Sequence, residues 1–290
     1  MTIYHLGLIG HPLSHSLSPR IQNAALQACG LEGEYSLFPV APDNLQGLKD
    51  LLARVRSGEI TGLNVTIPHK QNVIALLDEL TSTAKAIGAV NVIYLQNQKL
   101  VGDNTDAPGF LADLKRFIRG RESLIDKSAL VLGAGGSARA VVYALLCDGW
   151  KVTIAARRIE QARQLARSFK NYQLPITSLN SPILRAASLW DQSLISLLVN
   201  TTPIGMTPDI DQSPLPQNIS IPNGTIIYDL VYNPRETKLV RDARAQGLQA
   251  TTGLGMLIEQ AALGFTLWTG HNPPREAMMT AVEQSPISSL

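Results

Sequence analysis

Charged side chains of opposite sign follow two of the strands that the sequence predicts. Lys70 comes at the end of the alternating segment Asn64-Val65-Thr66-Ile67-Pro68-His69-Lys70, and Asp106 comes last in the polar cluster Asn104-Thr105-Asp106. A lysine can donate a proton to an alkoxide as it forms, and a nearby carboxylate can orient both the lysine and a substrate hydroxyl. The two side chains therefore indicate acid–base chemistry at a polar site.

Each of these side chains also has an ordinary structural interpretation. Lys70 can be a surface lysine, although Pro68 predicts a helix start and a lysine there opposes the helix macrodipole. Asp106 can cap the helix that follows it. His69 is a further acid–base candidate, and we expect it to flank the site rather than to act in it.

Hydroxyl side chains gather near the N-terminus. The segment from Gly10 to Pro19 contains Ser16 and Ser18 just before a predicted helix, where hydroxyls and a helix N-terminus can hold a carboxylate. Ser18 can instead be an ordinary helix N-cap. Ser16 has no such structural task, so it is the clearer candidate for a ligand contact.

A glycine-rich turn in the second half of the chain predicts a nucleotide site. The segment Gly133-Ala134-Gly135-Gly136-Ser137-Ala138 directly follows an apolar strand and opens a helix. Gly133 allows the tight turn, Gly135 lets the backbone approach a pyrophosphate, and Ala138 permits close helix packing, while the helix N-terminus attracts the anion. A glycine-rich turn without a nucleotide is the alternative.

The end of the next strand favours NADP(H) over NAD. NAD-binding proteins usually carry an acid there for the ribose hydroxyl, whereas this strand ends in Ala156-Arg157-Arg158. Two guanidinium groups can hold a 2′-phosphate through bidentate contacts. A solvated basic pair is the alternative, and Glu160 lies nearby but inside the next predicted helix.

Short apolar runs alternate with helical patterns, which is typical of α/β folds with a largely parallel sheet. Predicted strands cover residues 3–9, 35–40, 62–67, 89–95, 100–102, 129–132, 151–156, 194–200 and 225–231. Predicted helices cover residues 18–29, 44–57, a segment opened by Pro68, 107–119, 137–147, 159–168 and the segment from Gly253 onward. The charged segment 119–127 is the expected hinge between an N-terminal α/β unit and a dinucleotide-binding unit, and the last helices are expected to pack back on the first unit.

Composition excludes several other classes of protein. The chain of 290 residues has a formal net charge of +2 without a long basic run, so no nucleic-acid surface is expected. Cys29 and Cys147 lie far apart without a metal-ligand pattern, which argues against a metal site or a disulfide. No apolar run approaches the ~20 residues that span a bilayer, and Met1 leads into a strand without a signal-peptide pattern. We therefore expect a cytoplasmic protein that binds small molecules.

Taken together and in order, the motifs resemble the shikimate dehydrogenase family, part of a wider shikimate/quinate dehydrogenase group, over nearly the whole chain. The matching segments are Ser16-Leu17-Ser18-Pro19 with Asn23, Asn64-Val65-Thr66 with Pro68 and Lys70, Gly88-Ala89-Val90-Asn91, Asn104-Thr105-Asp106 with Gly109, Gly133 to Ala138, Asn200-Thr201-Thr202-Pro203 with Gly205-Met206, Tyr228-Asp229-Leu230-Val231-Tyr232-Asn233-Pro234, and Gly253-Leu254-Gly255-Met256-Leu257 with Gln260.

The resemblance implies NADP(H)-dependent interconversion of 3-dehydroshikimate and shikimate, a step in aromatic amino-acid biosynthesis, with Lys70 and Asp106 as the catalytic pair. The side chains implied to bind substrate are Ser16, Ser18, Asn64, Thr66, Lys70, Asn91, Asp106, Tyr232 and Gln260. The residues expected to bind the cofactor are Gly133, Ala134, Gly135, Gly136, Ser137, Ala138, Ala156, Arg157, Arg158, Thr201, Met206, Val231, Gly253 and Met256. The resemblance further implies a substrate domain of residues 1–106 and 253–290 and an NADP-binding Rossmann domain of residues 107–252, and we expect a monomer or a homodimer.

The chain departs from the family pattern at two places. Ala156-Arg157-Arg158 stands where Asn-Arg-Thr is common, which removes a polar side chain and a hydroxyl near the expected 2′-phosphate. Val92 replaces the usual threonine after Asn91, which matters little if Asn91 makes the contact. The first departure reduces the expected preference for NADP over NAD.

Two alternative functions stay open. One is quinate dehydrogenase on the same fold, whose substrate has an extra ring hydroxyl that Ser16 and Ser18 would crowd. The other is a catalytically silent NADP-sensing or scaffold protein. The presence of both Lys70 and Asp106 argues against the silent protein.

Overall fold

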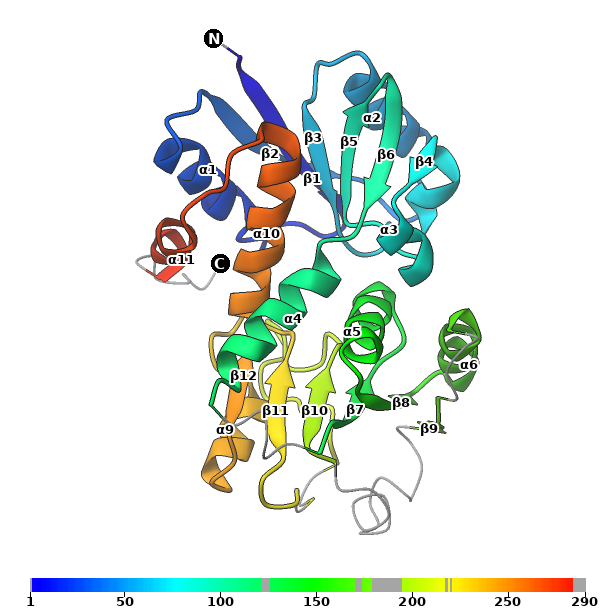
Figure 1. The fold of residues 1–290 in the computed structure, drawn as a ribbon, viewed down its shortest axis with the longest axis vertical. Coiled ribbons are helices and arrows are strands. Elements are labelled where there is room, and N and C mark those ends of the chain that lie inside the picture. The colour runs from blue at the N-terminus through cyan, green and yellow to red at the C-terminus, as the bar shows by residue number, and fades with distance from the viewer. Residues whose placement is uncertain are drawn as a thin grey trace. The chain divides into compact units, whose positions relative to one another are not determined.

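The structure is a computed structural model that describes residues 2–120, 126–169, 174–178, 195–216, 219 and 221–283. The chain forms two compact units, Met1–Gly109 with Leu257–Leu290, and Phe110–Met256. Each unit contains a six-stranded sheet with helices beside it (Figure 1). The chain crosses from one unit to the other within the helices α4 (Asp106–Phe117) and α10 (Leu254–Thr269). The α/β class predicted from the sequence is confirmed.

The sheet of the first unit has the strand order β2-β1-β3-β5-β6-β4. Its strands are β1 (Tyr4–Gly10), β2 (Gly33–Pro39), β3 (Gly62–Val65), β4 (Glu79–Leu80), β5 (Val92–Gln96) and β6 (Lys99–Asp103). Its helices besides α10 are α1 (Ser18–Ala28), α2 (Leu45–Arg56), the 3₁₀ helix η1 (Asn72–Leu76), α3 (Ser82–Ile87) and α11 (Arg275–Glu283).

One strand of this sheet runs against the others. β5 pairs antiparallel with β3 and with β6, whereas β1 is parallel to β2 and β3, and β4 is parallel to β6. The carboxyl ends of β1, β3 and β6 therefore share one edge of the sheet with the amino end of β5. Ligands of parallel sheets bind beyond the carboxyl edge, so this edge is where a site is expected.

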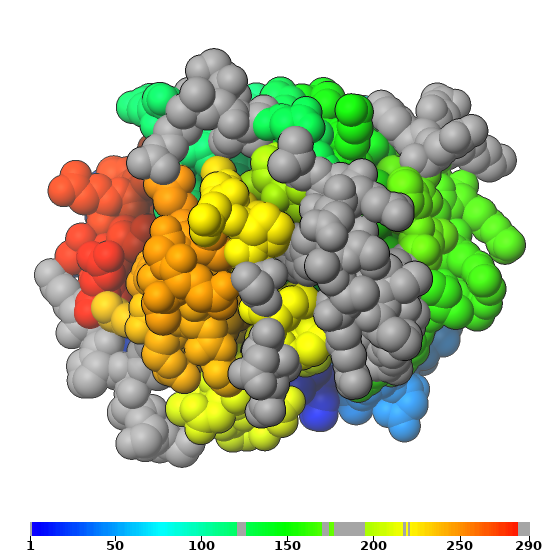
Figure 2. All heavy atoms as spheres, turned by 90° about the horizontal axis from the view of Figure 1, so that it is seen from below, coloured from blue at the N-terminus to red at the C-terminus, as the bar shows by residue number. Residues whose placement is uncertain are grey.

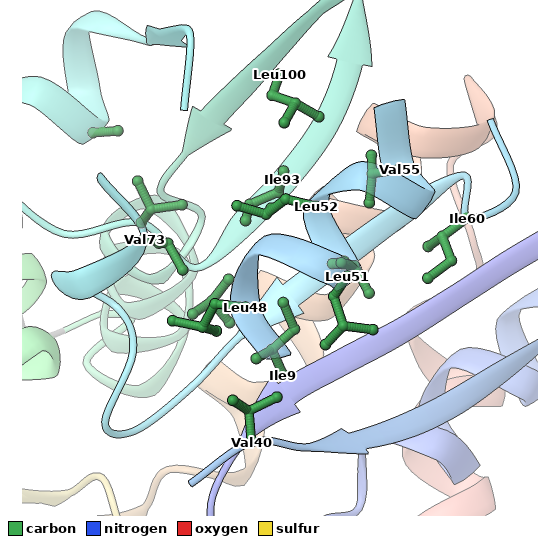
Figure 3. Close-up of a cluster of buried hydrophobic side chains, with 14 residues drawn as sticks. Ile9, Val40, Leu48, Leu51, Leu52, Val55, Ile60, Val73, Ile93 and Leu100 are labelled. Atoms are coloured by element: carbon green, nitrogen blue, oxygen red, sulfur yellow. The ribbon is translucent and has the colours of Figure 1, made fainter. Parts of the chain in front are cut away.

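Helix α2 covers one face of this sheet because its apolar residues recur at helical spacing. Leu48, Leu51, Leu52 and Val55 are buried and belong to one cluster with residues from four of the strands, including Ile9 of β1 (Figure 3). Fully burying such side chains stabilises a fold by roughly 1.5–3 kcal/mol each. The cluster therefore packs α2 against one face of the sheet and holds the strands in place.

Helix α10 packs on the same sheet through Trp268. The indole N–H donates to the carbonyl of Ile93 on β5 (3.1 Å). Gly62 on β3 has no room for a side chain, since an added Cβ would lie 2.1 Å from Trp268 Cδ1. The predicted return of the last helices to the first unit is therefore seen in α10 and α11, and α11 packs beside α1.

The second unit has an all-parallel sheet in the order β12-β11-β10-β7-β8-β9. Its strands are β7 (Ser128–Leu132), β8 (Lys151–Ala156), β9 (Ile176–Ser178), β10 (Leu197–Asn200), β11 (Ile226–Asp229) and β12 (Ala250–Thr252). Its helices include α5 (Gly136–Cys147), α6 (Ile159–Ser168) and α9 (Lys238–Ala245). Strand order reverses between β7 and β10, which gives the topology of dinucleotide-binding folds with a crevice at that switch point.

Helix α9 packs against β11 and β12 of this unit. Leu239, Val240 and Ala243 are buried in one cluster with residues of the sheet, while Arg241 and Arg244 face solvent. The outward face of α9 is part of the orange surface in Figure 2. The sequence pattern does not predict α9, β4, α3, β9 or β12, all of which are short elements.

The expectation that Pro68 opens a helix is wrong. Thr66 to His69 form a turn closed by a hydrogen bond from His69 N to Thr66 O (2.9 Å), and the next helical segment is η1. The strand predicted for residues 89–95 begins only at Val92, because Val90 N is bonded to Lys70 O (2.7 Å) instead of to a strand.

The described part of the chain contains neither a membrane-spanning helix nor a cluster of metal ligands. No helix there is long and apolar enough to cross a membrane. No group of three or more His, Cys, Asp and Glu side chains there is arranged to hold a metal ion.

Candidate active site and cofactor site

Lys70 and Asp106 form an ion pair in the first unit. Lys70 Nζ lies 2.5 Å from Asp106 Oδ2, and the two side chains are only 12% and 6% exposed. The interpretation of Lys70 as a surface lysine is therefore wrong. Water screens a largely buried pair poorly, so its field acts strongly on any reacting oxygen placed beside it.

Asp106 is not needed as a helix cap. Asn104 Oδ1 accepts the N–H of Ala107 in the first turn of α4 (3.3 Å), which is the capping contact. The Asp106 carboxylate instead receives Lys70 on Oδ2 and the side-chain amide of Asn91 on Oδ1 (2.8 Å). Donors on both oxygens hold the carboxylate in one orientation.

Asn91 joins several elements of the site. It is 2% exposed, and its Nδ2 also donates to Thr105 Oγ1 (3.0 Å) and to Gln260 Oε1 of α10 (3.3 Å). Its Oδ1 accepts from Thr105 N (2.7 Å), and its backbone carbonyl accepts from Asn64 Nδ2 (3.1 Å). Asn91 precedes β5, and it reaches the carboxyl edge because β5 is antiparallel.

Tyr35 is a site-associated residue that the sequence reasoning missed. Its hydroxyl donates to Asn64 Oδ1 (2.7 Å), and the ring is 4% exposed. This contact fixes which way the Asn64 amide faces, so its Nδ2 points to Asn91. The only signal in the sequence was a tyrosine within an apolar strand, because a buried tyrosine hydroxyl usually requires a partner.

The serine loop after β1 lies against the turn after β3. His11 N donates to Ile67 O (3.0 Å), which joins the two segments. Ser18 is the first residue of α1, and the N-cap position belongs to Leu17, so the interpretation of Ser18 as the N-cap is wrong. Ser16 does have a structural task, contrary to expectation, since its Oγ accepts from Ser18 N (3.2 Å). Both serines remain partly exposed.

His69 lies beside the site, as predicted, and not in it. It is fully buried, and its Nε2 is 2.7 Å from the carbonyl oxygen of Val40, the residue directly after β2. The first unit therefore brings together, at one sheet edge, a lysine, a carboxylate, amides and hydroxyls. Hydrogen bonds join five of the predicted residues, which are Asn64, Lys70, Asn91, Asp106 and Gln260. Ser16, Ser18 and Thr66 follow the parallel strands β1 and β3 of the same sheet, and their contact with a ligand stays a prediction. Such a set can bind a small polyhydroxylated acid and exchange a proton with it.

The glycine-rich turn of the second unit leaves space for a pyrophosphate. Gly133 has φ +117°, and an added Cβ would lie 2.4 Å from Thr201 Oγ1, so only glycine fits there. Gly135 is exposed with nothing near an added Cβ, and α5 begins after it without a side-chain cap. The first N–H groups of α5 are therefore available to an anion.

Arg157 and Arg158 are exposed directly after β8. Neither guanidinium makes an ion pair with another described residue. Glu160, the nearby acid, is paired with Arg163 on its own helix. The strand end therefore offers positive charge and no free carboxylate, which suits a 2′-phosphate.

The other predicted cofactor residues follow neighbouring strands of the second unit. Thr201 comes after β10, and its Oγ1 donates to Leu132 O beside the glycine turn (2.6 Å). Met206 is 46% exposed on the same loop, and Val231 follows β11. The remaining predicted cofactor residues of this unit are Ala134, Gly136, Ser137, Ala138, Ala156, Gly253 and Met256. Tyr232, predicted to bind substrate, also belongs to this unit, and burial raises the pKa of its hydroxyl.

Comparison with known proteins identifies relatives over nearly the full length. Residues 8–93 match the family model of the shikimate dehydrogenase substrate binding domain, residues 117–190 match shikimate/quinate 5-dehydrogenase, and residues 253–283 match the shikimate 5′-dehydrogenase C-terminal domain. The shikimate dehydrogenase (NADP(+)) of Salinibacter ruber is 43% identical over 278 residues, which are 95% of each chain.

Solved structures agree with these sequence matches. Shikimate 5-dehydrogenase from Thermus thermophilus, in complex with NADP(H) and shikimate, has a TM-score of 0.82 and 38% identity, covering 97% of this chain and 99% of that chain. Quinate dehydrogenase from Corynebacterium glutamicum, in complex with NAD, has a TM-score of 0.83 and 29% identity, covering 98% of this chain and 100% of that chain.

Proposed function

The chain belongs to the shikimate dehydrogenase family, and from this premise we propose that it is an NADP-dependent shikimate dehydrogenase with Lys70 and Asp106 as its catalytic pair. The reaction is the reversible reduction of 3-dehydroshikimate to shikimate, in aromatic amino-acid biosynthesis. The observation that carries the proposal is the buried ion pair, with 2.5 Å between Lys70 Nζ and Asp106 Oδ2, at the ligand-binding edge of the first sheet.

The residues of the second unit fit NADP(H). The open space beside Gly135 and the open first turn of α5 suit a pyrophosphate, and Arg157 with Arg158 suit the 2′-phosphate. When bound, NADP(H) supplies the hydride exchanged with the carbinol carbon of the substrate. The first unit would then be the substrate domain and the second the cofactor domain.

Lys70 handles the proton of the reaction. Reduction of the ketone turns the carbonyl oxygen into an alkoxide, which needs one proton. The Lys70 ammonium supplies that proton and stabilises the charge before transfer, an effect typically worth ~10²–10⁴ in rate. Asp106 holds Lys70 in place and accepts a hydrogen bond from a substrate hydroxyl.

The remaining side chains of the first unit bind and orient the substrate. Ser16 and Ser18, partly exposed at the start of α1, would receive the carboxylate. The ring hydroxyls would be bound by Asn64, Thr66, Asn91 and Gln260. Tyr232 as a substrate ligand stays a prediction, as do the cytoplasmic location and the monomeric or homodimeric state.

Steady-state kinetics of the purified protein test the proposal. Shikimate and quinate are each assayed with NADP and with NAD. The highest kcat/KM is expected for shikimate with NADP. Equal or higher values with quinate would reassign the substrate, because they would mean that the serine loop tolerates the additional ring hydroxyl. No turnover with any pair, in a protein that still binds NADPH, would instead support the silent NADP-sensing alternative.

A further inference from the structure

A carboxylate is buried at the carboxyl end of β11. Asp229 is 0% exposed, its Oδ1 accepts hydrogen bonds from Asn200 Nδ2 (2.8 Å) and Val231 N (3.0 Å), and its Oδ2 accepts one from Thr237 Oγ1 (2.7 Å). All of these donors are neutral. The arrangement differs from the Lys70–Asp106 pair, in which a cation compensates the charge.

Asn200 links Asp229 to the loop after β10 through its own side-chain hydrogen bonds. It lies opposite Asp229 in the parallel register of β10 and β11, which are adjacent strands in Figure 1. Its Oδ1 accepts from Thr202 N (3.0 Å) and Thr202 Oγ1 (2.7 Å), and its Nδ2 also reaches Ile204 O (3.4 Å). The Asn200 side chain therefore determines the path of residues 200–204.

Thr237 and Val231 hold the loop after β11 at both of its ends. Thr237 is the N-cap of α9, and its Oγ1 also accepts from Val240 N (3.3 Å). The two loops are then joined further along by Thr207, whose Oγ1 lies 3.1 Å from Asn233 Oδ1 and whose N donates to Asn233 O (3.1 Å). Asp229 is thus the point where both loops are fixed to the sheet.

Fold stability alone does not favour an acid at this position. Burial raises the pKa of Asp229 to about 6, although the hydrogen bonds from Thr237, Val231 N and Asn200 act in the opposite direction. At neutral pH the ionised group is therefore less favourable in the folded chain than in the unfolded chain. A neutral residue of similar shape would avoid this penalty, so a role beyond stability is the better explanation.

We propose that Asp229 is a positioning residue for the cofactor, which fixes the two loops that carry Thr201, Met206 and Val231. The inference rests on the proposed function, since it takes those three residues as cofactor contacts. Asp229 itself is fully buried and acts only through Asn200, Val231 N and Thr237.

Thr237→Val tests the inference, with Thr225→Val as a matched control. Both threonines are buried in the second unit and each donates one hydroxyl bond, but Thr225 lies before β11 and donates to Ile195 O (3.0 Å), at the other end of the strand. Both variants are expected to lower Tm. Only Thr237→Val is expected to raise the Kd for NADPH and the KM for NADP, by about fivefold or more, because the loop after β11 loses one of the bonds that fix it to Asp229.

Substitution of Asp229 adds an ordered series. Asn at this position keeps a carbonyl oxygen for Asn200 and Val231 N, whereas Ala keeps no acceptor, so the expected Kd for NADPH rises from wild type through Asp229→Asn to Asp229→Ala. If Asp229→Ala does not fold, the comparison of Thr237→Val with Thr225→Val still tests the inference. Equal NADPH affinity in Thr237→Val and Thr225→Val would overturn the inference. Absence of shikimate turnover in the wild type would instead overturn the proposed function, so the two failures are distinguishable.

Discussion

Replacing Asp229 by Asn should remove a loss of stability that the wild-type protein undergoes as pH rises to neutral. The pKa of this carboxyl is raised from 3.8 to about 6 because burial outweighs its hydrogen bonds. A difference of about two pH units between the folded and unfolded chains corresponds to about 3 kcal/mol of destabilisation once the group is ionised in both. Asn does not titrate and so lacks this term.

The sign of the pH dependence follows from which state binds the proton more tightly. The folded chain does, so wild-type stability is unaffected by this group below the unfolded pKa and falls as pH rises towards about 6. The free energy of unfolding of Asp229→Asn minus that of wild type should therefore increase by about 2 kcal/mol between about pH 4.5 and about pH 7.5. The slope is independent of any fixed loss of hydrogen bonding on substitution.

Denaturant unfolding of both proteins across that pH range measures the difference directly. Asp209→Asn is a suitable control, because Asp209 is an exposed aspartate of the same unit and its replacement should leave the pH dependence unchanged. A difference between Asp229→Asn and wild type that stays constant with pH would refute the reasoning. Such a result would mean that the pKa of the buried Asp229 carboxyl is not raised by folding. The argument that Asp229 destabilises the fold and is kept for positioning would then fail.

Two further predictions concern the ligand sites. Replacing Arg157 and Arg158 together by Ala should reduce the ratio of kcat/KM with NADP to that with NAD by about tenfold or more, because charge-assisted contacts to a 2′-phosphate are lost; an unchanged ratio would locate the 2′-phosphate elsewhere. Tyr35→Phe should raise the KM for shikimate about fivefold with little change in the KM for NADP, because the Asn64 amide loses the hydroxyl that orients it. Steady-state kinetics measure both, and a parallel rise in both KM values for Tyr35→Phe would indicate a general loss of structure.

The glycine-rich turn and the helix that follows it could be predicted because the constraint is local. Gly133 must be glycine on account of its own φ and the strand beside it, and the strand, turn and helix are consecutive in the sequence. The same holds for the positions of Lys70 and Asp106 just after strands. Strand ends can be recognised from a few residues, and parallel strands bring them to one edge.

The role of Asn91 could not be predicted from position alone. It lay inside a predicted strand, and its place at the ligand edge depends on β5 running antiparallel to both neighbours. Strand direction is decided by long-range pairing and not by the residues of one strand. The sequence pattern predicts a helix start at Lys70 for a related reason, since Pro68 is equally compatible with the turn that the structure contains.

Tyr35 and Asp229 were missed because their partners are distant in sequence. Tyr35 bonds Asn64, and Asp229 bonds Asn200, each 29 residues away along the chain. A polar residue in an apolar strand shows only that some partner is needed. Which partner it finds follows from strand order, which becomes visible only in the folded chain.

The catalytic assignment of Lys70 is tested most directly by the turnover number of Lys70→Ala. Shikimate oxidation by NADP is measured at saturating ligands, together with shikimate binding, and Lys85→Ala serves as a control because Lys85 is an exposed lysine of the same unit. The expected result is a kcat lower by ~10²–10⁴ with shikimate binding largely kept, since the contact acts mainly in the transition state. A kcat within about threefold of wild type would contradict the assignment of Lys70 as the proton donor.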